Sequence, residues 1–325
     1  MESFLILLET PPNINLHLDN LALKTGSLFK GVKSIPTGAH YLFYNFEGGT
    51  KSGFFFYAEE RKATIKKWDP QTENFSKVST EDEEIYESNI REFDVLLVEY
   101  PNMNYQIWQL LACYINSEVI GKIEPISNII SQINEEYSTS EENLEKFSIV
   151  KGSLFYTHIP KSIAKPNITP EEITQMNFDK SFILYDLLNK DFQNPENLLG
   201  ELQFSFLAFL LGDSLESFYQ WKNILILLCN CESALLQIPS FFEKFIPAFY
   251  SQLQSISQDL FTDDLIGPNF LSSCLRSFLS LLHNKNLPPS VYTRGKKFKK
   301  LVKSMLKISE FEMCEDEEAP IIVEI

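Results

Sequence analysis

The residue types that most often catalyse reactions are present in this chain, but they lack the spacing that catalysis requires. Four histidines, His17, His40, His158 and His283, are scattered, and none has the H-x-x-x-H or H-x-E spacing of a catalytic zinc site. The phosphate-binding motif G-x-x-x-x-G-K-[ST], the dinucleotide-binding motif G-x-G-x-x-G and the nucleophile motif G-x-S-x-G are missing. The sequence therefore predicts a protein that is not an enzyme and has no catalytic, cofactor-binding or metal-binding residues.

The cysteines do not suggest a metal site or a disulfide framework either. Their number is odd and no spacing repeats, which is typical of reduced thiols in a cytosolic or nuclear protein. Cys229 and Cys231 fall in a predicted helical run, where side chains two residues apart point about 200° apart and cannot readily chelate one ion. We interpret both as structural and Cys314 as an exposed thiol near the C-terminus.

Two polar residues, Glu201 and Gln203, interrupt an apolar helical stretch that runs from Leu198 to Leu211. Buried polar groups need hydrogen-bond partners, so we expect internal hydrogen bonds or packing beside a loop. The alternative is a face that contacts another protein. A third hypothesis, a cryptic enzyme that uses Glu201 or His40, requires a cleft at one of these residues.

Composition suggests an ordinary soluble protein with an acidic surface. The 325 residues are long enough for two domains, and 44% of them are hydrophobic. The formal charge of −16 repels nucleic acid overall and favours either a basic protein partner or a simple solvated surface. No run of 18 apolar residues is present, and residues 4–8 lack the basic flank of a signal peptide, so we expect no membrane contact.

The first 130 residues predict a β-rich domain. Alternating or aromatic runs indicate strands at residues 13–19, 40–46, 54–57 and 63–68, and close turns favour an antiparallel sheet or a small sandwich. Apolar residues at near-helical spacing predict two helices, within 85–97 and 105–115, that cover one face of the sheet.

A polar segment, 131–168, is predicted as a linker, and 169–309 as an all-α domain. Thr169 and Pro170 are typical of the N-terminus of a helix. A second, central and buried helix is predicted to begin at Asn194-Pro195-Glu196 and to end at Gly212. Asp213 and Glu216 have capping-box spacing, and more helices are expected at 240–258, 269–283 and 291–308. The expected fold class is therefore α+β, with an acidic and β-branched tail at 310–325.

The helix at 291–308 is basic, and six acidic residues follow it within 310–318. We favour a solvated face whose charges pair internally with those acids. The alternative is an RNA-binding protein that uses this helix. Its basic residues are Arg294, Lys296, Lys297, Lys299, Lys300, Lys303 and Lys307.

The C-terminal residues form a β-branched run after the acidic segment, which is unusual because free termini are usually polar. Two interpretations stay open. The run adds a strand to the open sheet edge of a partner, or it pairs with the protein's own N-terminal sheet. The expected contact residues are Pro320, Ile321, Ile322, Val323 and Glu324.

Two motifs and their order along the chain resemble the Aar-two splicing-factor family. Residues 29–40 read FKGVKSIPTGAH, which is similar to the family's F-x-G-V-K-x-I-P-x-G-x-H segment, and 200–206 read GELQFSF, which is similar to its G-E-L-Q-F-[SA]-F helix. Trp68, Trp108 and the tail fit in the same order. The motif residues, which we interpret as structural, are Gly31, Lys33, Pro36, Gly38, His40, Gly200, Glu201, Gln203, Phe204 and Trp221.

The resemblance implies a β-rich N-terminal domain, a VHS-like helical C-terminal domain and a partner. That partner is the U-five particle protein Prp-eight, bound at its RNase-H-like and MPN-type domains, with the tail bridging the two as an added strand. Holding them together would block early docking of the Brr-two helicase and of RNA on a cytoplasmic precursor that later matures in the nucleus. We also expect no cofactor, no obligate nucleic acid and a monomer when the partner is absent.

Overall fold

The computed structural model describes residues 3–89, 93–101, 105–131, 153–160, 178–256 and 270–306. It confirms the α+β class, with a two-sheet N-terminal part and a helical C-terminal part. Most of the predicted linker, the helix signals at 169–172, Cys314 and the whole tail lie outside these ranges.

The first sheet has five strands in the order β8-β7-β1-β4-β9. Both β1 with β7 and β4 with β9 pair in parallel, so this sheet is mixed rather than purely antiparallel. The central strand, β1, was not predictable from its own residues, because their continuous apolar run has no alternation. The strands are β1 (Ser3–Leu8), β4 (Gly31–Ile35), β7 (Ala63–Asp69), β8 (Asn74–Lys77) and β9 (Leu97–Glu99).

The second sheet is antiparallel throughout, in the order β10-β6-β5-β2-β3. Its strands β2, β5 and β6, together with β7 in the first sheet, coincide with the four predicted strands. The members of the second sheet are β2 (Asn15–Leu18), β3 (Leu21–Lys24), β5 (Gly38–Asn45), β6 (Ser52–Ala58) and β10 (Ile130–Ser131).

The two sheets pack face to face around one apolar core. Leu5 and Leu7 from β1 meet Leu42 from β5 and Phe54 from β6 in this core, and all four are buried. A smaller cluster around Ile65 lies on the other face of the first sheet. The result is a β-sandwich in which the central strands direct alternate residues into the core, such as Leu5 and Leu7 of β1.

The helices of the N-terminal half differ in part from the prediction. The helix α1 (Thr80–Ser88) buries no residue, and the chain continues as a short 3₁₀ turn, η1 (Asp94–Leu96), into β9. The predicted helix over 85–97 is confirmed in part: the residues up to Ser88 and Phe93 are helical, whereas Leu96 lies in the 3₁₀ turn and Leu97 pairs as a strand. The second predicted helix is present as α3 (Tyr105–Ala112), and a further helix, α4 (Ser117–Ile123), follows it.

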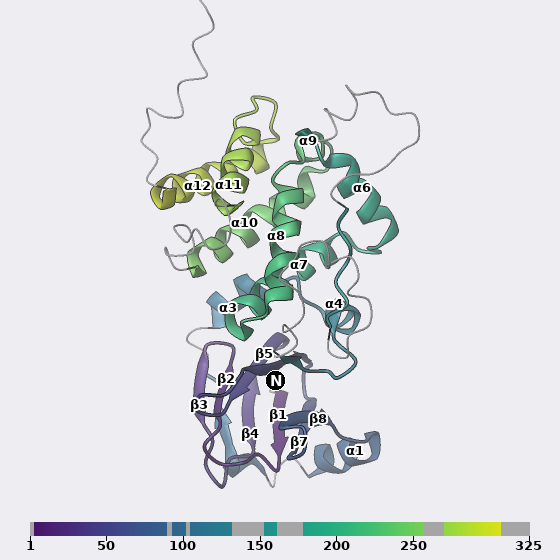
Figure 1. Ribbon diagram of the computed structural model, residues 1–325, viewed down its shortest axis with the longest axis vertical. Helices are drawn as coiled ribbons and strands as arrows, with labels where there is room; N and C mark the ends of the chain where they lie inside the picture. The colour runs from purple at the N-terminus through teal and green to yellow at the C-terminus, as the bar shows by residue number, and fades with distance from the viewer. Residues whose placement is uncertain are drawn as a thin grey trace, which may run out of the picture. The chain divides into compact units, whose positions relative to one another are not determined.

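The chain forms two compact units that are interleaved in sequence. Residues 1–159 and 187–224 make the N-terminal unit, and residues 160–186 and 225–325 make the C-terminal unit. The central helix α7 (Glu196–Gly212) belongs to the N-terminal unit, where it contacts β5, β10, α3 and α4 (Figure 1). The predicted domain boundaries at 130 and 169 stay predictions.

The predicted limits of α7 are confirmed, but the predicted cap of the next helix is wrong. Asp213 has a left-handed backbone and ends α7 as its C-cap. Ser214 takes the capping role, because its Oγ accepts a hydrogen bond from the backbone N–H of Ser217. The flanking helices are α6 (Ser181–Lys190) and α8 (Leu215–Leu228).

The remaining helices of the C-terminal unit pack around phenylalanine side chains. Phe245 and Phe249 of α10 and Phe278 of α11 are fully buried, and the ring of Phe245 contacts the rings of the other two. None of the helices in the described ranges is both long and apolar enough to cross a membrane. The helices are α9 (Glu232–Gln237), α10 (Pro239–Ser255), α11 (Phe270–Leu281) and α12 (Pro289–Leu306).

One lysine of the N-terminal unit is buried, and it gives a pH-dependent prediction. The ammonium of Lys66 lies 4.8 Å from the ring centre of Phe54, and burial with the nearby Lys77 lowers its pKa to about 8. Glu124 and Glu83 oppose this shift. Below about pH 8, Lys66 is protonated in both the folded and the unfolded state. Its buried charge therefore lowers the free energy of unfolding in that pH range.

Replacing Lys66 with methionine is expected to stabilise the chain at pH 7 by about 1–2 kcal/mol. Between pH 8 and 10.5 the unfolded state holds the extra proton, so the stability of the wild type rises relative to the variant and the difference shrinks. Urea unfolding at pH 7 and pH 9.5 measures it. Lys67→Met is the matched control, since the exposed Lys67 on the same strand pairs with Glu9. A difference that is constant with pH would contradict the assignment.

Candidate functional site

The motif residues of the first segment lie on β4, at the start of β5 and between these two strands. Gly31 has φ +140°, and a Cβ atom there would lie 1.9 Å from the carbonyl oxygen of Leu5, so only glycine fits beside β1. Lys33 pairs with Asp94 at 2.9 Å and thereby joins β4 to the segment before β9. Gly38, the first residue of β5, also has φ +140°.

His40 belongs to a buried polar network with Asp19 and Tyr100. Its Nδ1 lies 2.6 Å from Oδ2 of Asp19, and its Nε2 lies 2.8 Å from the carbonyl oxygen of Pro36. Tyr100 donates its hydroxyl to the same Oδ2 at 2.8 Å, and the backbone N–H of Tyr41 donates to Oδ1. Both ring nitrogens face oxygen acceptors, so His40 has no free nitrogen with which to act as a base.

The second motif lies on α7 and fastens this helix to the N-terminal unit. Gln203 accepts a hydrogen bond from the backbone N–H of Tyr114 at 2.8 Å and donates one to the carbonyl oxygen of Leu110 at 3.1 Å. It therefore satisfies backbone groups at the C-terminal end of α3. Gly200 lets α7 approach the same loop, because a Cβ atom there would lie 2.4 Å from the carbonyl oxygen of Tyr114.

Glu201 holds the segment 153–160 against α7. Its carboxylate accepts hydrogen bonds from the backbone N–H and the hydroxyl of Thr157, each at 2.7 Å, and from the amide of Gln220 at 2.8 Å. Lys122 approaches to 3.6 Å and supplies an opposite charge. Glu201 is 1% exposed, so this carboxylate is fully used inside the fold.

The two aromatic motif residues extend this fastening by packing. The ring of Phe204 stacks on Phe55 of β6, with ring centres 4.0 Å apart. Trp221 of α8 is fully buried and contacts Phe206 and Phe209 of α7. The motif residues thus join α7 to the sheet on one side and to α8 on the other.

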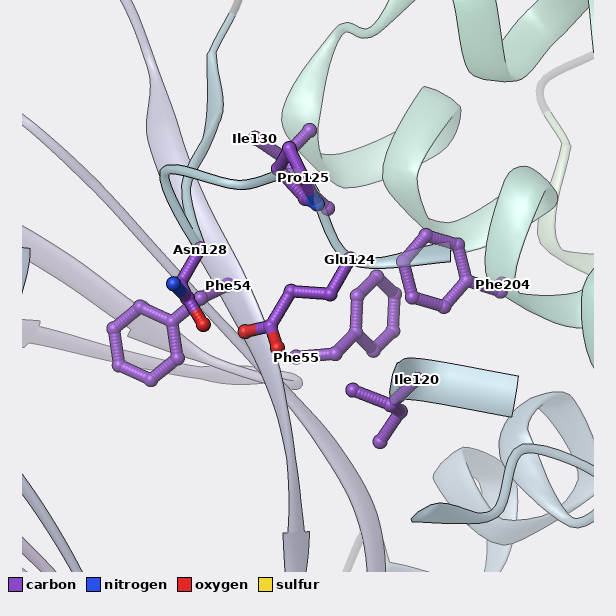
Figure 2. Close-up of a pocket in the computed structure, with 8 residues that line it drawn as sticks. All are labelled: Phe54, Phe55, Ile120, Glu124, Pro125, Asn128, Ile130 and Phe204. Atoms are coloured by element: carbon purple, nitrogen blue, oxygen red, sulfur yellow. The ribbon is translucent and has the colours of Figure 1, made fainter. Parts of the chain in front are cut away.

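A small pocket lies where α7 meets the second sheet, and sequence analysis did not predict it. Figure 2 shows Glu124 among the lining residues, with its carboxylate directed towards Asn128 and Phe54. Lys77 pairs with this carboxylate at 3.3 Å. The pocket opens to solvent, and the space that it encloses is only large enough for about one water molecule, so it does not resemble a ligand site. In the sequence, only Glu124-Pro125 after α4 marks the pocket, and this pair has no spacing that distinguishes it from an ordinary helix end.

The cysteines are placed differently from the prediction. Cys229 and Cys231 lie in the turn between α8 and α9 rather than inside a helix. Both are buried, and burial raises the pKa of each thiol well above its usual range. Within the described ranges, no group of three or more histidine, cysteine or acidic side chains is arranged to hold a metal ion.

The close approach at Gly200 gives a second prediction. Gly200→Ala is expected to lower the free energy of unfolding by about 2 kcal/mol, because the added methyl pushes α7 away from the backbone of Tyr114. Gly121→Ala is the matched control in α4, where nothing lies within 4 Å of the new Cβ atom. There we expect a gain of about 0.5–1 kcal/mol from helix propensity. Thermal unfolding of both variants tests the pair, and equal shifts would contradict the close contact.

The chain is similar to known proteins over both of its halves. Residues 1–125 match the family description "AAR2 N-terminal domain", and residues 156–310 match "AAR2 C-terminal repeat region". A human protein described as "Protein AAR2 homolog" is 28% identical over 98% of this chain and 93% of its own. A Caenorhabditis elegans protein of the same description is 28% identical over 84% of each chain. The Saccharomyces cerevisiae protein "A1 cistron-splicing factor AAR2" is 24% identical over 84% of this chain and 83% of its own.

Proposed function

The chain belongs to the AAR2 family, and from that premise we propose that it is a splicing assembly factor that works by binding a protein of the spliceosome. The yeast relative is described as a splicing factor, which supports this role. Binding rather than catalysis is the proposed activity, because the polar groups of His40 and Glu201 are occupied inside the fold.

The observation that carries the proposal is the ordered match of both family domains, together with the structural use of the motif. Gly200, Glu201 and Gln203 hold one helix in place, and their polar atoms and close contacts are not available to a ligand. Because the motif residues make their contacts inside the molecule, their role is structural. We therefore place the binding function on the surface of the protein and in the tail.

The proposed partner is a Prp-eight-type protein of the U-five particle, bound at its RNase-H-like and MPN-type domains. The tail residues 320–324 would add a strand to one of these domains, because β-augmentation uses main-chain hydrogen bonds and suits a β-branched segment. The factor would hold the particle in a precursor state and delay docking of the helicase and of RNA. It would act first in the cytoplasm and leave in the nucleus.

Titration calorimetry with the full chain tests the proposal. The two partner domains are titrated singly and together against the full chain and against Ile322→Pro. Proline removes a backbone N–H from the added strand, so we expect about a tenfold or greater loss of affinity for the domain that the tail contacts. Ile322→Val keeps the strand and its β-branched side chain, and we expect binding close to that of the wild type.

The results distinguish the proposed role of the tail from the proposed identity of the partner. Unchanged binding by Ile322→Pro would remove the tail from the interface and leave the helical part as the contact surface. If neither partner domain bound the full chain, the proposed partner would be wrong.

A further inference from the structure

One face of α12 is fixed inside the C-terminal unit. Val291, Gly295, Phe298 and Val302 recur every three or four residues and are all buried. The ring of Phe298 contacts Phe249 of α10 and Phe278 of α11, with centres 5.3 and 5.4 Å apart. This packing fixes which side chains the helix presents to solvent.

The remaining circumference of α12 is strongly basic. Arg294, Lys296, Lys297 and Lys300 are exposed, while Lys299 and Lys303 are half-buried, and the helix contains no acidic residue. None of these six cations forms an ion pair with any other residue that the structure describes. Burial and the neighbouring Lys303 lower the pKa of Lys299, as expected for crowded like charges.

This concentration of positive charge departs from the chain as a whole. The chain has 44 acidic and 28 basic residues, yet one helix of 18 residues holds six cations and no acid. Like charges on adjacent turns repel one another, and an anionic partner relieves that repulsion. The basic face is therefore electrostatically complementary to a polyanion.

An exposed aromatic residue on the same face favours a nucleic acid over other polyanions. Tyr292 is 55% exposed and precedes Lys296 by four residues, so the two side chains are neighbours on the helix surface. Lys300 follows after another four residues, about 6 Å further along the axis. Proteins that bind single-stranded nucleic acid combine such rows of cations with aromatic rings on which bases stack. An acidic peptide needs only the cations.

We propose that the exposed face of α12, defined by Tyr292, Lys296, Lys300 and Lys303, binds single-stranded RNA through its phosphates. Tyr292 supplies a ring for one base, and the lysines neutralise the phosphates along the strand. The protein's net charge of −16 limits this binding to low or moderate salt and to a local site. The inference is independent of the protein partner proposed above.

Fluorescence anisotropy of a labelled oligouridine with the full chain tests the proposal. The variant Lys296→Gln, Lys300→Gln, Lys303→Gln is compared with Lys62→Gln, Lys67→Gln, Lys77→Gln, which changes the net charge equally but alters exposed ion pairs of the N-terminal unit. The first variant is expected to lose about tenfold or more in affinity at 50 mM salt. The slope of log affinity against log salt is expected to become shallower by about 2, because each of the three lost phosphate contacts contributes roughly 0.7 to it. Tyr292→Ala is expected to weaken binding without changing that slope.

Three results would overturn the proposal. The first is no RNA binding by the wild type at low salt. The second is an equal loss in both triple variants, which would indicate a general charge effect. The third is competition by polyglutamate as effective as that by unlabelled RNA, which would indicate an acidic polypeptide, such as residues 310–318 of this chain, as the occupant.

Discussion

Replacing Asp19 with alanine is expected to lower the free energy of unfolding by about 4 kcal/mol, because it removes the shared acceptor of a buried polar network. The carboxylate of Asp19 lies 2.6 Å from Nδ1 of His40 and accepts hydrogen bonds from the hydroxyl of Tyr100 and the backbone of Tyr41. Each of these groups would stay buried without its acceptor. Asp19 also has φ +54°, a conformation that alanine adopts less readily than aspartate.

Urea unfolding followed by tryptophan fluorescence measures this effect, since Trp108 stacks beside His40. Asp94→Ala is the control, because Asp94 forms an ion pair with Lys33 while its side chain is 56% exposed. Such exposed pairs contribute at most about 1 kcal/mol. If the two variants unfolded at the same urea concentration, the network would have no special role in stability.

Replacing Glu201 with alanine is expected to cost about 3 kcal/mol, since three donors lose their acceptor in a buried place. Two of them belong to Thr157 and one to Gln220. The change is expected to act locally as well as globally. The segment 153–160 has no helix or strand of its own, and this carboxylate accepts from both the backbone and the side chain of Thr157, so the amide proton of Thr157 should exchange faster with solvent.

Hydrogen exchange at the Thr157 amide, combined with thermal unfolding, distinguishes the local from the global effect. Glu232→Ala is the matched control, because Glu232 lies exposed in the first turn of α9. There we expect a loss of about 0.5 kcal/mol from the helix dipole and no change at Thr157. Unchanged exchange at Thr157 in Glu201→Ala would show that other contacts hold the segment.

Elements with strong local signals were predictable. The strand β2 alternates polar and apolar residues, and the helix α7 begins after Pro195 and ends at Gly212. The strand β9 was not predictable, because it has three residues and is specified by its parallel pairing with β4, about 65 residues away. Local apolar spacing favoured a helix there, and the tertiary pairing prevailed.

The polar interactions of the motif were predictable only in kind. That Glu201 would need hydrogen-bond partners follows from its apolar surroundings, but Thr157 lies 44 residues away and is preceded by a polar stretch. Likewise, His40 on β5 and Asp19 in the turn after β2 are 21 residues apart. Nothing local in the sequence specifies such pairs. The burial of Lys66 was also missed, because lysines are almost always exposed.

The place of α7 in the chain has a consequence for biosynthesis. The outer face of the second sheet carries Tyr41 and Phe55, and its cover, α7, emerges from the ribosome some 80 residues after β10 is complete. At about 5–20 residues per second, the nascent sandwich waits several seconds with aromatic side chains uncovered. Slow translation between residues 131 and 212 would lengthen that interval, so yield in cells should respond to codon usage there.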